Sequence, residues 1–175
     1  MASPKPLPLE TVPAALKQAH HYRLLNEPAL AESICRDIVA VDDNNEIAWI
    51  TLLLALTDQF DEKYAHALDH AKECLGKLQT DFHRLYYEGI IYERWARAQQ
   101  KKSIPLETIE SWVRNAMRFY DQSAELAPAD DPHPVLRWNT CARYLDEIEQ
   151  KRPQTNSPGS MRDMHNEFGD DVPFR

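Results

Sequence analysis

Two stretches decide how this chain folds: residues 85–92, LYYEGIIY, and residues 116–128, AMRFYDQSAELAP. Apolar and aromatic residues recur in them at the three- and four-residue spacing of one helix face. Each stretch also contains a small residue, Gly89 in the first and Ala116 in the second, close to a tyrosine. Small side chains allow two helices to approach each other, and large ones fill the space toward the next helix. The two stretches therefore predict a pair of closely packed helices.

The same spacing extends from Thr11 to about Lys151 and is interrupted by segments rich in turn and capping residues. The strongest interruptions are residues 41–46, VDDNNE, and residues 126–134, LAPADDPHP. They predict seven helices, at about residues 11–25, 28–41, 46–58, 61–78, 81–101, 105–127 and 133–150. Short connections make neighbouring helices antiparallel, so we expect an all-α fold of stacked helical hairpins.

Three consecutive segments repeat one pattern of small and aromatic residues. The repeated positions are Ala19, Tyr22 and Ala31 in the first segment, Trp49, Leu52 and Ala65 in the second, and Gly89, Tyr92, Ala116, Tyr120, Ser123 and Pro128 in the third. This pattern resembles the tetratricopeptide repeat (TPR) family, whose 34-residue helix-turn-helix units stack into a right-handed superhelix. The resemblance implies about three repeats, at residues 12–45, 46–80 and 81–128, and a capping helix at 133–150. Asp43 replaces the family's proline in the first closing turn, and the third hairpin is lengthened around residues 101–105. An unrelated helical bundle is the alternative, because helical periodicity fits both.

The helical domain is expected to span residues 11–152. Residues 1–10 contain three prolines and predict an extended N-terminal arm. Residues 153–175 have the polar composition of a disordered tail. The last helix carries one apolar stripe that we expect to cover the final repeat, formed by Val135, Trp138, Ala142 and Leu145.

Composition excludes several classes of protein. A net charge of −8 and a pI near 5.3 argue against a nucleic-acid partner, which requires a basic face. No apolar run is long enough to span a membrane, and the N-terminus lacks an export signal. Three cysteines, Cys35, Cys74 and Cys141, are an odd number and are expected to be buried reduced thiols. These features predict a cytoplasmic protein with no membrane partner.

The sequence contains none of the usual arrangements for catalysis. It has no glycine-rich phosphate loop and no G-x-S-x-G nucleophile turn, so we expect neither an enzyme nor a cofactor. His66, His70 and Cys74 share one helix face with a spacing that can hold zinc. A fourth ligand is not evident, and the face is expected to point to solvent with Cys74 partly exposed. We therefore expect no metal site.

The resemblance to TPR proteins implies a binding groove on the first helix of each hairpin. Its predicted lining residues are Leu16, His20 and Arg23, then Ile50, Leu54 and Thr57, and finally Tyr86, Ile90 and Glu93. Some relatives bind a terminal carboxylate with lysines and asparagines, but these places hold Leu16, His20 and Thr51 here. The apolar middle instead predicts a peptide or amphipathic helix as ligand. Alternatively, the N-terminal arm or a second subunit of a homodimer covers it.

One basic cluster lies at the end of the fifth predicted helix and consists of Arg94, Arg97, Lys101 and Lys102, with Trp95 among them. It could bind an acidic partner or RNA. It could also be a solvated helix end, because cations complement the helix dipole there.

The tail regains apolar residues around an acidic pair in a motif formed by Phe168, Asp170, Asp171, Val172 and Phe174. It could fold back as a plug, recruit another protein, or be inert. The letters DDVPF also resemble the acidic tip of bacterial single-stranded-DNA-binding proteins, but Arg175 follows the phenylalanine and no DNA-binding barrel precedes the tail. We therefore predict a non-enzymatic protein-interaction module that is an adaptor, a scaffold or chaperone-like, with secretion chaperones as one precedent. A small regulatory RNA-binding protein is the alternative.

Overall fold

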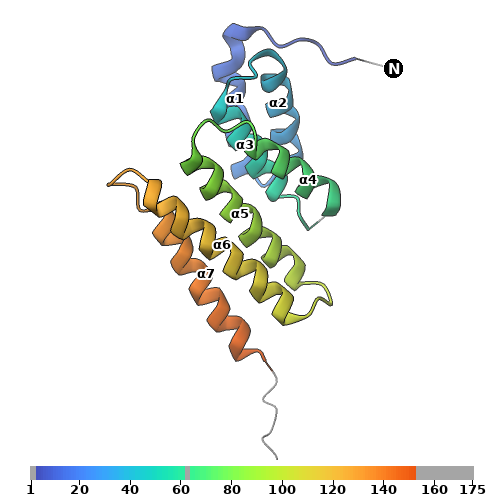
Figure 1. The fold of residues 1–175 in the computed structure, drawn as a ribbon. Helices are drawn as coiled ribbons and strands as arrows, with labels where there is room; N and C mark the ends of the chain where they lie inside the picture. Colours follow the sequence, from blue (N-terminus) through green and yellow to red (C-terminus); the bar gives the residue numbers. More distant parts are fainter. Residues whose placement is uncertain (1–2, 62–63, 153–175) are drawn as a thin grey trace, which may run out of the picture.

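A computed structural model describes residues 3–61 and 64–152 of the chain (Figure 1). This part contains seven α-helices and no strand, which confirms the all-α expectation. The helices are α1 (Val12–Leu24), α2 (Pro28–Val41), α3 (Glu46–Thr57), α4 (Tyr64–Leu75), α5 (Asp81–Gln100), α6 (Leu106–Leu126) and α7 (His133–Gln150). A short 3-10 helix, Leu9–Thr11, precedes α1. Every helix begins and ends within about three residues of its predicted bounds.

Local capping explains several of these bounds. The Asn45 side chain accepts a hydrogen bond of 3.1 Å from the Ala48 backbone N–H at the start of α3. Thr80 does the same for the His83 N–H at the start of α5, also at 3.1 Å. Such caps satisfy backbone donors that a helix leaves free in its first turn. Between α1 and α2, Asn26 has a φ of 59°, a left-handed conformation that asparagine tolerates better than most residues.

The odd-numbered helices form one layer of the molecule. Each helix packs against the next one in the chain, while α1 also contacts α3, and α3 also contacts α5. Side chains connect α5 to α7 as well, because Arg137 of α7 reaches Glu93 of α5. On the other side, Arg36 of α2 is hydrogen-bonded to His70 of α4. Figure 1 shows the consequence: antiparallel neighbours stack in series, and α5, α6 and α7 are the longest helices.

The small residues of the repeated pattern lie at close helix contacts. Ala19, Ala31 and Ala116 have no exposed surface. At Gly89, an added Cβ would lie only 2.6 Å from Cε1 of Tyr120, a fully buried residue of α6. Glycine is therefore required where α5 crosses the Tyr120 ring, which is the close approach that the sequence predicts.

The N-terminal arm and the last helix both pack against the helical core. Leu7 packs against the small core of Val12, Ile38 and Ala48, so the described part of the arm lies there. On α7 the buried residues are Pro134, Cys141, Tyr144 and Ile148, whereas Val135 is 56% exposed. The predicted stripe of α7 is therefore wrong at Val135, while Trp138 and Leu145 pack at the edge of the core. The fully buried positions lie one residue away, a rotation of about 100° about the helix axis. The reason is that α7 turns Arg137 and Tyr144 toward α5.

Candidate functional site

The residues predicted to line a groove lie on α1, α3 and α5, but they differ in accessibility. Leu16, Arg23, Ile50, Leu54 and Tyr86 are half-buried, and His20 is exposed. The His20 ring Nε2 lies 2.8 Å from the Thr51 hydroxyl, a direct link between α1 and α3.

Three of the predicted groove residues are buried. Thr57, Ile90 and Glu93 are only 4%, 3% and 2% exposed, so they offer little surface to a partner. The expectation that they form the surface of a groove is wrong for Ile90 and Glu93, whereas Thr57 lines the pocket described below. Ile90 belongs to the apolar core between α5, α6 and α7, while Thr57 and Glu93 hold arginine side chains in place.

Glu93 is the centre of a polar network inside the C-terminal part of the molecule. Its carboxylate accepts a hydrogen bond of 2.8 Å from the Tyr120 hydroxyl. The same carboxylate lies 3.4 Å from Nη1 of Arg137 and 3.5 Å from Nε of Arg97. Burial, followed by the charge of Glu93 and its hydrogen bond, raises the pKa of Tyr120 far above its usual value. Glu93 thus joins α5, α6 and α7 and fixes two guanidinium groups at the odd-helix layer.

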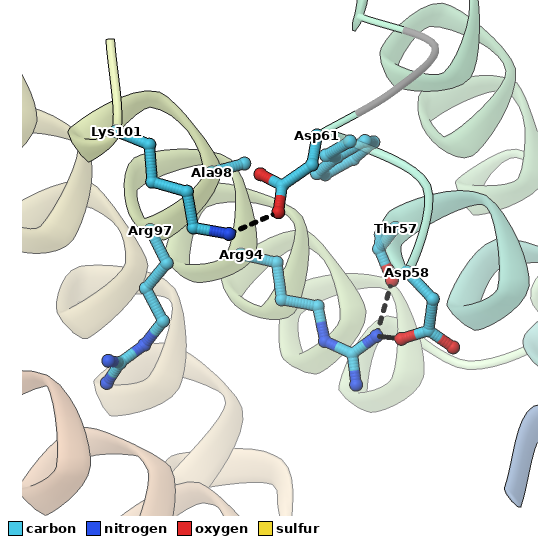
Figure 2. Close-up of a pocket in the computed structure, with 8 residues that line it drawn as sticks. Thr57, Asp58, Asp61, Arg94, Arg97, Ala98 and Lys101 are labelled. Atoms are coloured by element: carbon cyan, nitrogen blue, oxygen red, sulfur yellow. Dashed lines mark hydrogen bonds and ion pairs between the residues drawn. The ribbon is translucent and has the colours of Figure 1, made fainter. Parts of the chain in front are cut away.

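Asp58, at the end of α3, is the second carboxylate of this layer. It lies between two arginines: Arg23 of α1 at 2.9 Å, and Arg94 of α5, which also donates a 2.8 Å hydrogen bond to the Thr57 hydroxyl (Figure 2). Burial is the main cause that lowers the pKa of Arg94. Asp58 therefore links the first, second and third hairpins.

A pocket of about 240 Å³ opens beside these groups. It lies between the connection that follows α3 and the C-terminal half of α5, as Figure 2 shows. Its lining residues are Thr57, Asp58, Phe60, Asp61, Arg94, Arg97, Ala98 and Lys101. Lys101 pairs with Asp61 across the pocket at 2.5 Å, while the Arg97 guanidinium points away from both aspartates.

The predicted basic cluster forms much of this pocket. Arg94, Arg97 and Lys101 line it, whereas Lys102 does not. The three lining residues pair with Asp58, Glu93 and Asp61. Arg94 is thus built into the fold by its ion pair, whereas Lys101, 74% exposed, and Lys102 lie at a solvated helix end as the alternative expected.

Positive charge nevertheless exceeds negative charge at this face. The four arginines that gather here are Arg23, Arg94, Arg97 and Arg137, and the two carboxylates that they contact are Asp58 and Glu93. Lys101 and Asp61 balance each other. Four positive charges minus two negative ones leave a surplus of two in a chain whose net charge is −8. This surface can therefore bind an anionic group.

Arg97 is the most exposed of the four arginines and retains hydrogen-bonding capacity. Among the described residues, its two terminal nitrogens have no hydrogen-bond partner, since only Nε approaches Glu93. Its guanidinium lies over the Tyr144 ring at 4.2 Å, and its side chain is 41% exposed. The stacked ring holds the guanidinium while its donors remain accessible.

The histidine and cysteine face of α4 differs from the prediction at Cys74. Cys74 is only 2% exposed, and burial raises the pKa of its thiol to about 12. It points into the core because Ala67 and Ala71 share its face of α4. The rings of His66 and His70 lie 3.9 Å apart. Across residues 3–61 and 64–152, no three groups come together that could hold a metal ion.

A second pocket, of about 190 Å³, lies between α2, α3 and α4. Two cations at its rim, Arg36 and Lys77, pair with Glu32 and Asp43. Glu73 also lines this pocket. Three carboxylates therefore face two cations here, so this pocket has no surplus of positive charge, in contrast to the arginine face.

Sequence reasoning found part of the site and missed its organising groups. The sequence predicted three members of the site: Arg23, Arg94 and Arg97. It did not predict that Asp58, the Tyr120 hydroxyl and Arg137 also belong to it. Asp58 stands in a short connection between helices, and its sequence neighbours do not reveal its partners, which lie 35 and 36 residues away. Arg137 is one of several cations on its helix, and its sequence neighbours do not distinguish it. Only the packing of α7 on α5 brings it to Glu93.

The chain matches no family model, and it shows no significant similarity to a curated protein or to a solved structure. The resemblance to TPR proteins therefore rests on the residue pattern. In the part of the chain that the structure describes, no helix combines the length and apolar character needed to cross a membrane. The tail motif, Phe168 to Phe174, lies outside the described residues.

Proposed function

We propose that this chain is a non-enzymatic protein-interaction module of the TPR type, with three repeats and a capping helix. It acts as an adaptor, a scaffold or a chaperone-like protein. Its ligand is a peptide or helical segment that lies on the odd-helix layer, and its tail motif recruits a protein or occupies this layer. The observation that carries the proposal is the surplus of arginine charge beside a preformed pocket in an acidic chain.

The chemistry of the site supports binding rather than catalysis. Guanidinium groups and paired carboxylates bind and orient anionic ligands. Burial raises the pKa of Cys35, Cys74 and Cys141 to about 12 each, so the thiols are protonated near neutral pH and are poor nucleophiles. All three cysteines are free, which fits a reducing compartment, and we place the protein in the cytoplasm.

The size and lining of the pocket fit a peptide side chain. Small-molecule sites commonly have volumes of ~300–1,000 Å³, and this pocket is smaller. Phe60 and Ala98 supply an apolar wall, and Arg97 supplies donors at the mouth. A ligand segment with an apolar side chain next to a carboxylate would contact the apolar wall and bind the Arg97 donors.

The test is affinity capture with three full-length baits: the natural chain, Arg97→Glu, and the control Arg114→Glu on the exposed face of α6. Charge reversal at Arg97 is expected to reduce capture of the specific partner by at least tenfold, because it removes the free donors of the site. The Arg114 variant should capture the partner as the natural chain does. Equal capture by all three baits would refute a role for this face. Circular dichroism of each bait verifies the fold.

The alternative function, RNA binding by the basic cluster, has weaker support. Arg94 and Lys101 are already paired with carboxylates, and a phosphate backbone would have to compete with them. RNA binding would fall steeply with salt, roughly in proportion to the number of phosphates contacted. A titration with a mixed-sequence RNA at two salt concentrations distinguishes the two functions.

A further inference from the structure

The odd-helix layer has a charge surplus and a preformed pocket, and these features specify the chemistry of its occupant. We propose that the occupant is an acidic segment with apolar anchors, and that residues 167–174 of this chain, EFGDDVPF, bind there in cis. This inference rests on the proposed function and identifies what the site recognises.

Charge complementarity is the first argument. The face carries two more positive than negative charges, and Asp170 and Asp171 supply two adjacent carboxylates. The terminal nitrogens of Arg97 present a planar pair of donors, which matches the two oxygens of one carboxylate. A second carboxylate would lie near Arg94 or Lys101, whose present partners are side chains of the same pocket.

The apolar part of the segment is the second argument. Phe60 is a core residue that also lines the pocket, and Ala98 lies beside it on α5. Both residues are buried, 1% and 8% exposed, so they form only the apolar base of the pocket next to the cations. In the tail sequence, phenylalanine and valine likewise flank the aspartates.

The point at which the chain leaves α7 is the third argument. Arg152 forms an ion pair with Glu110 near the start of α6, so the chain exits at the end of the bundle where α5 connects to α6. Figure 1 shows the α5–α6 connection and the end of α7 at the same end of the molecule. Lys101, which lines the pocket, directly follows α5 at this end. The 17 residues between Arg152 and Asp170 can span up to about 55 Å when fully extended. Crossing two neighbouring helices requires only roughly 20 Å, so this linker is long enough. A segment on the same chain also has a local concentration as high as the millimolar range.

The test is zero-length cross-linking of the full-length chain with a carbodiimide, which joins a lysine amine to a carboxylate in direct contact. Equal amounts of unlabelled and ¹⁵N-labelled protein are mixed before the reaction, and the cross-linked peptides are identified by mass spectrometry. The Lys101–Asp61 pair, 2.5 Å apart, is an internal positive control. We expect a second product that joins Lys101 to Asp170 or Asp171, with both peptides from the same isotopic chain.

Two variants sharpen the result. The double variant Asp170→Asn, Asp171→Asn removes both acceptors and should abolish the tail product while the Lys101–Asp61 product persists. The matched control Asp163→Asn removes a tail carboxylate outside the motif and should leave the tail product unchanged. Arg97→Glu should reduce the tail product about tenfold, because the loss of one charge-assisted contact is worth at least ~1.4 kcal/mol.

The inference is overturned if Lys101–Asp61 forms and the tail product does not, or if Arg97→Glu leaves the yield of the tail product unchanged. Products of mixed isotope would also overturn it, because they place the segment on a second copy. The affinity capture described above is independent of these results. If capture depends on Arg97 but no tail product forms, the proposed function stands and the cis occupant is wrong. If capture rises when Asp170 and Asp171 are replaced, both proposals are supported, because the tail competes with the partner.

Discussion

The first two hairpins and the third hairpin with α7 hold their helices together differently. Between α1 and α4 the core consists of alanine, cysteine, leucine and phenylalanine side chains, such as Ala71, Cys74, Leu53 and Phe60. Between α5 and α7 the core is also apolar, but a buried carboxylate and a buried tyrosine hydroxyl lie within it. The N-terminal part also buries polar side chains, but they are neutral: Thr51 is hydrogen-bonded to His20, and Gln59 to Glu32. The C-terminal part instead buries a carboxylate, which makes its polar contacts more costly to lose.

The difference shows why the candidate site lies where the two parts meet. A buried carboxylate requires compensating donors, and Glu93 obtains them from α6 and α7. Asp58 obtains its donors from α1 and α5, across the junction. Each of the two carboxylates therefore contacts two arginines in the same layer. Because each has one negative charge and two cationic partners, the layer has a surplus of positive charge.

Replacing Glu93 should have the largest effect on stability. Glu93→Ala leaves the buried Tyr120 hydroxyl and the Arg137 guanidinium without their acceptor, and we expect a loss of about 3–5 kcal/mol in the free energy of unfolding. Urea denaturation followed by circular dichroism measures it. The control Glu147→Ala, exposed on α7, should change little. A loss below about 1 kcal/mol for Glu93→Ala would mean that the C-terminal part does not depend on its polar network.

Gly89→Ala should have the next largest effect. The added methyl group would overlap the Tyr120 ring, which cannot move without losing its bond to Glu93. Overpacking costs about 1–3 kcal/mol, partly offset by the better helix propensity of alanine. The matched control is Gly76→Ala, where the nearest atom would lie at an ordinary 3.5 Å. Equal unfolding free energies for the two variants would contradict the close contact between α5 and α6.

Asp58→Asn tests the junction between the two parts. Its side chain is 25% exposed, so the ion pairs with Arg23 and Arg94 are partly screened and their loss should cost about 0.5–1 kcal/mol. The effect should shrink at high salt. Chemical denaturation at low and high salt measures both, with the exposed Asp69→Asn on α4 as control. A salt-independent loss would show that Asp58 acts through its packing rather than through its charge.

The smallest effect concerns pH and the N-terminal part. Burial raises the pKa of Glu46, but the Gln79 backbone N–H, His83 and Arg84 together outweigh it, and the net pKa is lowered. A group whose pKa is lower in the folded state adds stability above its unfolded pKa, near 4.5, and this contribution disappears as the pH falls through the folded value. Glu46→Gln should therefore lose less stability than the natural chain between pH 6 and pH 3. Parallel pH profiles of unfolding would contradict the shift.

The sequence by itself determined the number of helices, their bounds and the positions that must be small. These properties depend on residues within a few positions of one another: caps such as Asn45 and Thr80, turn-rich breaks, and the helical spacing around Gly89. Interactions between residues close in sequence are sufficient to predict these properties, because a helix forms its hydrogen bonds within its own segment.

Only the tertiary structure decided which polar residues are buried, which face of α7 points inward, and where the arginines gather. Glu93 and Arg137 are 44 residues apart, and Arg23 and Asp58 are 35 residues apart. Whether such a pair forms depends on the rotation of each helix about its axis, and one residue changes that rotation by about 100°. The spacing of residues along a helix fixes its faces, but the neighbouring helices determine which face each one meets. The arginine face is therefore a property of the assembled layer, and its charges gather because the buried carboxylates of the fold require partners.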